Sequence, residues 1–430
     1  MGILSLFSAS RRSPQAINLA SPQFKASPYD YYAKLRAESP IVRTTLPTGE
    51  PGWLISRYDD AVAVLKDERF VKDRANALTP AQLAREPWFR KLFRSLNHQM
   101  LSKDPPDHTR LRALVSQAFT PRLIEQMRDR IQALADELLE PIQARGRLDL
   151  IHDFALPLPS IVIAEMLGVP AKDRHAFHRW STALLGAAQT KRHLFYAVPN
   201  VLQFMRYLRK LIAKRRAEPR NDLVSAMIQA EEAGDRLNPE ELRAMTMLLL
   251  VAGHETTVNL IGNGMLALMQ HPDQMEKLRR DPGLIRLAVE ELLRFTCPVD
   301  FATDRLARQD VSMGGLTIPR GELVFVILTS ANRDERQFPN PDKLDITREP
   351  NRHLAFGLGP HFCLGAPLAR LEGQLAINTL LRRLPNLRLP VKPSELRWRR
   401  GLLLRGLQAL PVEFDPTPSQ FQYNQEPVTM

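Results

Sequence analysis

Cys363 carries the clearest chemical signal in this chain. It lies in a turn-like run from Phe356 to Gly365 that also contains Gly359 and His361. Glycine at 359 and 365 permits positive φ and a close approach of the backbone. Phe356 can shield one side of the sulfur, and the N–H groups of a following helix can point at it, which favours the ionised thiol. These features predict a thiolate held beneath a flat cofactor, rather than a structural cysteine after a glycine-rich turn.

A second group of chemical interest is expected within a long helix. Asn238 is a strong N-cap because Pro239 follows it and a glutamate three residues on completes a capping box, and the next stop signal is His271 before a proline. About 32 residues of helix span roughly 48 Å, enough to cross a whole domain. The apolar stretch at 247–253 is too short to span a bilayer.

The middle of this helix carries residues that stability alone does not favour. Gly253 costs about 1 kcal/mol relative to alanine, and the carboxylate of Glu255 must be paired or neutral if it is buried. Thr256 can donate a hydrogen bond to the carbonyl of Ala252, four residues earlier, which opens the helix slightly. The space beside these small residues could then admit a diatomic ligand.

Two further motifs place polar side chains on one helix face. Glu291 and Arg294 are three residues apart, and His108 and Arg112 are four apart, so each pair shares a face. An exposed pair of the first kind is usually worth under about 1 kcal/mol, and a lone cation is often simply solvated. Arg305 stands at the start of a predicted strand. Arg112 is the first candidate for holding a carboxylate, because a guanidinium binds one through two hydrogen bonds.

The composition indicates a soluble globular protein. The chain has 430 residues, of which 44% are hydrophobic and 25% charged. Its two cysteines, Cys297 and Cys363, are too few for a disulfide framework, so we expect a cytoplasmic protein. The opening residues 1–7 are too short for a membrane anchor. A net charge of +12 favours an acidic partner, but the basic residues are dispersed, which argues against nucleic acid.

The periodicity predicts a mainly α-helical protein with small β-sheets. We expect a single large domain over residues 21–415, between a flexible arm at residues 1–20 and a flexible tail at residues 416–430. An irregular connection is expected over residues 71–100. Strands are predicted in residues 41–55, 302–328 and 387–414. Helices besides the long one are predicted at 31–38, 59–66, 107–118, 121–144, 158–167, 172–185 and 198–216.

Together these motifs resemble those of the cytochrome P-450 family, from about residue 25 to residue 415. The run at Cys363 is similar to the haem-thiolate signature F-x-x-G-x-x-x-C-x-G, and the segment at Thr256 resembles A-G-x-D/E-T. Glu291 begins a match to E-x-x-R, and His108 begins a match to H-x-x-x-R. The resemblance implies a haem-thiolate monooxygenase of the soluble, bacterial type, built as one domain around a long central helix.

The resemblance also implies roles for the residues. Haem b would have Cys363 as the axial ligand of its iron, and dioxygen would bind beside Ala252 with protons supplied by Thr256 and Glu255. The E-x-x-R pair would lock the cysteine loop, with Arg348 in place of the family's usual third partner. The residues implied around the haem are His108, Arg112, Arg305 and His361 at the propionates, and Phe356, Gly359 and Gly365 near the sulfur.

The substrate and redox partners follow from the same resemblance. Segments that line the pocket in relatives correspond to residues 71–100, 183–196, 296–301 and 401–404, which are mostly apolar and predict a lipophilic small molecule. The pocket candidates are Pro298, Val299, Leu402 and Leu403. Electrons from NAD(P)H would arrive through an acidic ferredoxin and its reductase.

The ferredoxin would dock on the face that bears Cys363. The resemblance implies that the helix at 367–383, together with Arg110, Arg112 and Arg122, flanks this face with cations. The protein is expected to act as a monomer.

The sequence also raises three alternative functions. A peroxide-driven peroxygenase is disfavoured by the presence of Glu255 and Thr256. A haem-thiolate protein that binds or senses a gas without turnover is a second alternative. A cysteine hydrolase using Cys363 and His361 is disfavoured, because no orienting group or oxyanion pattern accompanies the pair.

Overall fold

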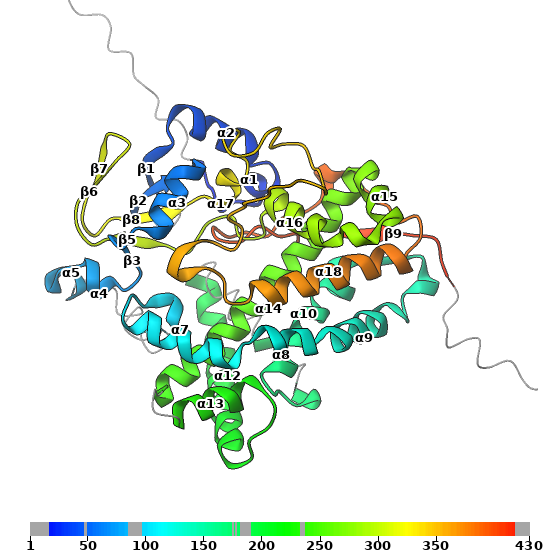
Figure 1. Cartoon of the computed structure of the whole chain (residues 1–430), viewed down its shortest axis with the longest axis horizontal. Helices are drawn as coiled ribbons and strands as arrows, with labels where there is room; N and C mark the ends of the chain where they lie inside the picture. Colours follow the sequence, from blue (N-terminus) through cyan, green and yellow to red (C-terminus); the bar gives the residue numbers. More distant parts are fainter. Residues whose placement is uncertain are drawn as a thin grey trace, which may run out of the picture.

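The computed structural model describes residues 17–46, 50–84, 97–173, 176, 179–180, 191–232 and 237–417. Figure 1 shows the main sheet and the β6–β7 pair on one side, with β9 on the opposite side near α15. The predicted helix at 172–185 and the pocket segment at 183–196 fall largely outside the described residues.

Helices form most of the structure. The longer ones are α2 (Tyr29–Glu38), α3 (Tyr58–Lys66), α7 (Asp107–Ala118), α9 (Arg128–Leu139), α10 (Pro157–Met166), α12 (Lys191–Ala217), α13 (Leu223–Glu232), α14 (Pro239–Gln270), α15 (Pro272–Arg280), α16 (Ile285–Thr296) and α18 (Ala366–Arg383). Short helices are α1 (Pro22–Ala26), α4 (Arg74–Ala77), α5 (Pro80–Ala84), α8 (Pro121–Gln126) and α17 (Leu328–Ala331). Single turns of 3-10 or π-helix are η2 (Met100–Ser102), η3 (Gln143–Arg145), η4 (Ile151–Ala155), η5 (Ala171–Asp173), η6 (Pro282–Leu284), η7 (Gly359–His361) and η8 (Pro393–Glu395).

The strands form three small sheets. Five of them make the largest sheet in the order β1-β2-β8-β5-β3, while β4 pairs with β9 and β6 with β7. The predicted hairpin is confirmed, with Ile41 opposite Ile55. The strands are β1 (Ile41–Thr45), β2 (Pro51–Ile55), β3 (Phe70–Val71), β4 (Arg147–Asp149), β5 (Arg305–Ala307), β6 (Val311–Met313), β7 (Leu316–Ile318), β8 (Leu323–Val326) and β9 (Pro411–Glu413).

The long helix α14 is the centre of the core. Asn238 accepts hydrogen bonds from the N–H groups of Glu240 and Glu241, and the Glu241 side chain accepts from the N–H of Asn238, so the predicted capping box is confirmed. The helix packs against α10, α16 and α18. Gly373 of α18 permits the last of these contacts, because a Cβ there would lie 2.9 Å from a methyl carbon of Leu260.

The burial of α14 agrees with a role as a core helix. It is long and apolar enough to cross a membrane, but 61% of its most apolar window is buried inside the fold. The core helix of a soluble protein has these properties.

Two predictions about elements need correction. The helix predicted at 121–144 is divided into α8 and α9, because the N–H of Met127 bonds to the carbonyl of Ile124, one residue short of the α-helical spacing. The connection predicted as irregular at 71–100 contains α4 and α5, although residues 85–96 lie outside the described part.

The packed fold also extends slightly beyond the boundaries predicted at residues 21 and 415. Leu19 is buried, the carbonyl of Ala20 accepts a hydrogen bond from Gly401, and Thr417 donates to the carbonyl of Gln143. Residues 1–16 and 418–430, the rest of the predicted arm and tail, lie outside the described residues.

Candidate active site

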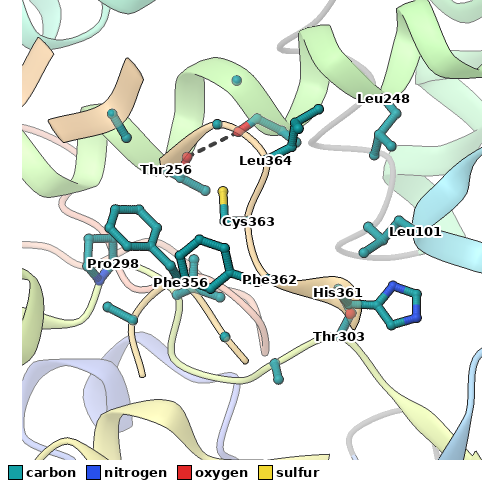
Figure 2. Close-up of a pocket in the computed structure, with 18 of the residues that line it drawn as sticks. Leu101, Leu248, Thr256, Pro298, Thr303, Phe356, His361, Phe362, Cys363 and Leu364 are labelled. Carbon is teal, nitrogen blue, oxygen red and sulfur yellow. Dashed lines mark hydrogen bonds between the residues drawn. The ribbon is translucent and has the colours of Figure 1, made fainter. Parts of the chain in front are cut away.

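One cavity gathers the predicted residues. Its volume is about 410 Å³, and its walls come from α7, α14, α18, the loop before α18 and the segments at 298–305 and 403–404. Figure 2 shows Cys363, Thr256, Phe356 and His361 around it. The side chain of Cys363 is exposed to this space. The fold therefore brings together motifs that lie more than 250 residues apart in the chain.

The loop that carries Cys363 is fixed by its backbone. The N–H of Cys363 donates to the carbonyl of Phe356 at 2.9 Å. Gly359 has a φ of +73°, and a Cβ there would lie 2.6 Å from the carbonyl oxygen of Leu65, so only glycine fits. Gly365 does not have the predicted positive φ, since its φ is −79°. It serves instead as the residue before α18, and a Cβ there would meet the sulfur only at ordinary contact distance.

The surroundings of Cys363 shift the pKa of its thiol. Burial raises the pKa of the Cys363 thiol, and the N–H of Gly365, the guanidinium groups of Arg112 and Arg370 and the N–H of Ala366 only partly oppose this effect. The thiol is therefore neutral at neutral pH in the protein alone. A bound metal cation would remove its proton, because a coordinating thiol is deprotonated.

Polar groups without an acidic partner line the side of the cavity near His361. Among the described residues, the Nε2 atom of His108 is buried with no hydrogen-bond partner, and its ring lies 4.3 Å from that of His361. Arg305 is 4% exposed, and its guanidinium donates only a long 3.4 Å bond to the carbonyl of Thr303. Arg112 lines the same cavity.

The electrostatics of this cluster favour an anion. Burial, together with the positive charges of Lys72, His108, Arg305 and Arg112, lowers the pKa of His361 to about 2. Burial also lowers the pKa of Arg305 to about 10. A cofactor with two carboxylates would supply the missing counter-charges, so these residues fit the propionates of haem. Lys72 was missed from the sequence, because only the tertiary structure places it beside His361.

Thr256 and Glu255 lie where α14 borders the cavity. The hydroxyl of Thr256 donates to the carbonyl of Ala252 at 3.1 Å, which confirms the predicted hydrogen bond within the helix. Glu255 accepts a hydrogen bond from Arg399 at 3.2 Å. Burial raises the pKa of Glu255, and Arg399 partly opposes this shift. Arg399 was not predicted, because it lies 144 residues from Glu255 in the chain.

Glu372, whose carboxyl lies near Thr257 of the cavity wall, is a second acid that was not predicted. Glu372 of α18 is fully buried, and neither of its carboxyl oxygens has a well-formed hydrogen bond. Burial raises the pKa of Glu372 to about 8, opposed by the nearby hydroxyl of Thr257. The side chain is therefore mostly protonated at neutral pH. No spacing in the sequence distinguishes it from a surface glutamate of an amphipathic helix.

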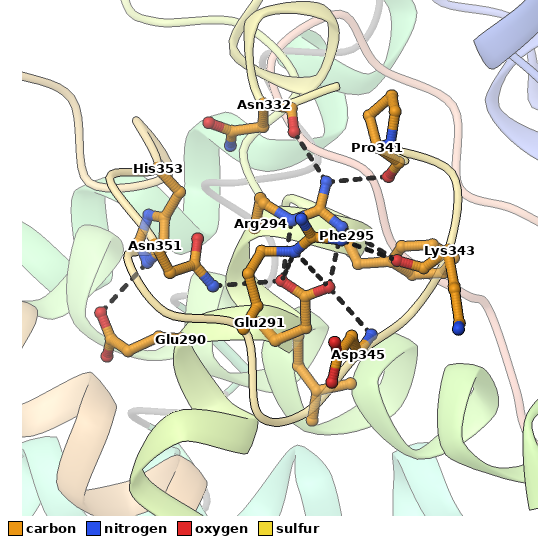
Figure 3. A network of polar contacts seen from close by, with 12 residues as sticks. Glu290, Glu291, Arg294, Phe295, Asn332, Pro341, Lys343, Asp345, Asn351 and His353 are labelled. Atoms are coloured by element: carbon orange, nitrogen blue, oxygen red, sulfur yellow. Dashed lines mark hydrogen bonds and ion pairs between the residues drawn. The ribbon is translucent and has the colours of Figure 1, made fainter. Parts of the chain in front are cut away.

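The E-x-x-R pair is a buried ion pair behind the cysteine loop. Arg294 donates two hydrogen bonds to the carboxylate of Glu291, at 2.7 and 2.8 Å, and both side chains are fully buried. Arg348 contacts both oxygens of Glu291 at 3.2 Å, which confirms it as the third partner. Figure 3 shows that Arg294 also reaches the carbonyls of Asn332 and Pro341. The motif thus joins α16 to the chain that leads to Cys363.

Three of the four pocket candidates line the cavity. These are Pro298, Val299 and Leu403. Leu402 does not, because its side chain packs against a separate core cluster beside the main sheet. Leu404, the last residue of the predicted segment 401–404, lines the wall as well.

The predicted cationic face is largely neutralised by internal acids. Arg110 pairs with Glu241 at 2.5 Å, and Arg370 pairs with Glu290. Arg112 faces the cavity. Near the end of α18, Arg382 and Arg383 pair with Asp136. Of the cations predicted for this face, Arg122 remains as an exposed side chain at the start of α8.

The described residues contain no metal site built from side chains alone. Within the residues that the structure describes, no group of three or more His, Cys, Asp or Glu side chains could hold a metal ion. A single thiolate beneath a planar cofactor needs no such cluster, because the cofactor supplies the other ligands.

Comparison with known proteins agrees with the motifs and the cavity. The family model described as "Cytochrome P450" matches residues 12–282 and 283–404. The chain is 47% identical over 396 residues to a "Cytochrome P450" of Bacillus subtilis (strain 168), covering 92% of this chain and 96% of the relative. It is 46% identical over 407 residues to "Cytochrome P450 monooxygenase PikC" of Streptomyces venezuelae, covering 94% and 95%.

The solved structures agree in fold. The structure of the bacillaene polyketide synthase cytochrome P450 PksS of Bacillus subtilis 168 superposes with a TM-score of 0.86 at 44% identity, covering 93% of this chain and 99% of that one. The motifs, the cavity and these matches agree along nearly the whole length of the chain. It belongs to the cytochrome P450 family, and it is a cytochrome P450 monooxygenase.

Proposed function

We propose that this monooxygenase binds haem b through Cys363 and inserts one oxygen atom of O2 into a C–H or C=C bond of a lipophilic small molecule. The observation that carries the proposal is the cavity in which Cys363 and Thr256 meet the polar side chains of Arg112, Arg305, His108 and His361. We place the reaction in secondary or xenobiotic metabolism, within the cytoplasm. When bound, haem supplies the redox chemistry that activates dioxygen.

The chain's own residues have distinct tasks in this proposal. Arg112, Arg305, His108 and His361 hold the two carboxylates of the cofactor, since all four line the cavity. His108 and Arg305 are buried there, and the Nε2 atom of His108 has no hydrogen-bond partner in the described structure. Phe356 shields the sulfur from one side, and Arg370 lies 4.6 Å over its ring. The cysteine loop is thereby held rigid.

Thr256 and Glu255 move protons. The raised pKa of Glu255 makes it a better proton donor near neutral pH than an exposed carboxylate. Its bond to Arg399 holds the carboxyl at the edge of the cavity. The hydroxyl of Thr256 lies one residue further along the helix and can pass a proton into the cavity. An enzyme driven by peroxide needs no such pair.

The apolar wall of the cavity supports a lipophilic substrate. Relatives carry names that refer to polyketide biosynthesis and to vitamin D(3) 25-hydroxylation. One relative of known structure was solved with hexadec-9Z-enoic acid ligated to acyl carrier protein. We propose that the substrate here is of similar character, a bulky polyketide-like or fatty acyl molecule.

Electrons are proposed to come from NAD(P)H through an acidic ferredoxin and its reductase to a monomeric enzyme. The net charge of +12 supports an acidic donor. The patch of cations first predicted for this contact is mostly paired internally. The overall positive charge and the exposed side chain of Arg122 are therefore the features that support docking of the ferredoxin on this face.

The central test is the spectrum of the reduced carbon monoxide complex. The purified holoenzyme should show the long-wavelength Soret band of thiolate ligation, and Cys363→Ser should lose it because an alcohol cannot replace the thiolate. Cys297→Ser is the matched control, since that thiol is fully buried outside the cavity, and it should keep the band. An unchanged band in Cys363→Ser would refute the assigned ligand.

A second readout separates turnover from simple haem binding. With surrogate ferredoxin and reductase, lipophilic compounds that perturb the Soret band should increase NAD(P)H consumption and yield an oxygenated product. Consumption that no compound changes, in a protein with the thiolate band, would instead favour a non-catalytic binding or sensing role.

A further inference from the structure

Two wall segments of the cavity, residues 298–301 and 403–405, are paired along their backbones. The N–H of Asp300 donates to the carbonyl of Leu403 at 2.7 Å, and an isolated β-bridge continues the pairing. Side chains from both segments line the cavity. Because the backbones are bonded together, a displacement of one segment shifts the other.

Lys25 of α1 fastens both segments from behind. Its Nζ donates to Asp300 at 2.5 Å and to the carbonyl of Leu402 at 2.7 Å. The side chains of Lys25 and Asp300 are both fully buried. Arg405 completes the link, since its Nε donates to the carbonyl of Lys25 at 2.9 Å. The buried amine of Lys25 therefore contacts Asp300 in the first wall segment and Leu402, the residue just before the second. Arg405 of the second segment in turn holds the backbone carbonyl of Lys25.

The carboxylate of this pair is also held on its other side. The hydroxyl of Tyr32 lies 3.1 Å from each oxygen of Asp300, and Lys25 lies 5.3 Å from the centre of the Phe301 ring. Phe301 is itself part of the cavity wall. The anchoring cluster thus lies directly behind the lining side chains, with no intervening layer.

Stability alone does not require such an arrangement. A buried ion pair is often no more stabilising than apolar residues of similar volume, because both charges lose their hydration. What an apolar pair cannot supply is a set of directional bonds that fixes the distance between the Asp300 carboxylate and the Leu402 carbonyl. These bonds tie the paired wall segments to α1 and so fix where the wall stands in the cavity.

We propose that Lys25 is a positioning residue for the substrate. Through its bonds to Asp300 and Leu402 it sets where the paired wall formed by residues 298–301 and 403–405 stands relative to Cys363, and so selects which bulky apolar groups fit beside Cys363. This proposal rests on the proposed haem-thiolate function, because it takes the cavity to be the substrate pocket.

The test compares two probes that bind the haem iron of the intact holoenzyme. Imidazole is small and does not need the walls, whereas clotrimazole carries the same nitrogen ligand on a bulky apolar group. In Lys25→Met the ratio of the two dissociation constants, measured from the Soret shift, should change by about tenfold. The dissociation constant of imidazole should stay within about twofold of the wild-type value.

Further variants separate positioning from stability. The double variant of Lys25→Met with Asp300→Leu removes both charges, so it should recover stability and still show the altered ratio. Lys25→Arg keeps the charge with a different reach, and it too should shift the ratio. Arg383→Met is the matched control, because it breaks an internal ion pair with Asp136 whose residues do not line the cavity. It should leave the ratio unchanged.

The outcomes are distinguishable. A wild-type ratio in the double variant would show that the pair only stabilises the fold, and the proposal would be wrong. If Lys25→Met fails to hold haem, the double variant and Lys25→Arg decide the question in the same way. Absence of the thiolate band from the wild-type protein would overturn the proposed function itself, whereas a retained band with an unchanged ratio would overturn only the role of Lys25.

Discussion

Two fully buried ion pairs support opposite parts of the active site, and they differ in how the chain builds them. Glu291 and Arg294 are three residues apart on α16 and brace the cysteine loop. Lys25 and Asp300 are 275 residues apart and brace the cavity walls. Both pairs bury opposite charges completely, but only the first is visible as a spacing in the sequence.

The two pairs also differ in how fully their carboxylates are satisfied. Besides Arg294, Glu291 accepts hydrogen bonds from Arg348, from the side chain of Asn351 and from the N–H of Asp345. Asp300 has only Lys25 and Tyr32 as described side-chain donors. A densely satisfied carboxylate suits a fixed element such as the ligand loop. The sparser pair rests on fewer bonds, so the position of the cavity wall depends more strongly on the single side chain of Lys25.

The largest expected effect comes from breaking the first pair. Arg294→Met leaves the charge of Glu291 buried without its main partner and frees the carbonyls of Asn332 and Pro341. We expect a loss of about 3–5 kcal/mol in the free energy of unfolding, with poor haem retention. Urea unfolding followed by circular dichroism measures the first quantity, and the haem-to-protein absorbance ratio measures the second.

The matched control is Arg280→Met, which removes an exposed pair with Glu276 and should cost under about 1 kcal/mol. If Arg294→Met costs no more than this control, the first pair does not support the loop, and the contrast between the two regions disappears.

An intermediate effect is expected at Glu290, next to the first pair. Burial opposes its ionisation, but hydrogen bonds from Arg370 and His353 lower the pKa of Glu290 to about 2. Because the folded pKa lies below the ordinary value of 4.5, the stabilisation is fully present above about pH 4.5 and is lost as the pH falls towards 2. Glu290→Gln should cost about 1–2 kcal/mol at pH 7, after allowance for partial exposure.

Chemical unfolding from pH 2 to pH 7 checks this prediction. The difference in unfolding free energy between wild type and Glu290→Gln should shrink as the pH falls below about 4.5. A difference that is constant with pH would mean that packing, rather than ionisation, links α16 to α18 at this position.

The smallest effect on stability is expected at Thr256, which faces the cavity. Thr256→Ala loses one hydrogen bond within α14, so the change in unfolding free energy should stay within about 1 kcal/mol. The substitution should instead impair the reaction itself, because the variant lacks the hydroxyl that passes protons into the cavity. Less product and more hydrogen peroxide should form for each NAD(P)H consumed, measured with a lipophilic compound that perturbs the Soret band.

Thr246→Val provides a control on the same helix, since the hydroxyl of Thr246 is buried and bonded to the carbonyl of Leu242. It should leave the coupling of NAD(P)H consumption to product unaffected. If Thr256→Ala couples NAD(P)H consumption to product as well as the wild type does, other groups must deliver the protons. Glu255 would then lack its proposed partner.

Local spacing was enough for several parts of this protein. The bounds of α14 follow from a capping box and a proline stop, both of which act within a few residues. Glu291 and Arg294 meet because three residues span almost one helical turn, and the hydrogen bond from Thr256 to Ala252 spans four. In each case the geometry is set by the backbone of one element, so the sequence by itself determined it.

Other features were decided only when the elements packed together. Arg399 reaches Glu255, and Lys25 reaches Asp300, across distances in the chain that no periodicity encodes. The raised pKa of the Cys363 thiol likewise depends on burial by the surrounding chain. Leu402 packs away from the cavity because the second core cluster lies beside it. Residue spacing along one element fixes local geometry, whereas desolvation and long-range ion pairs exist only once distant segments exclude water from one another.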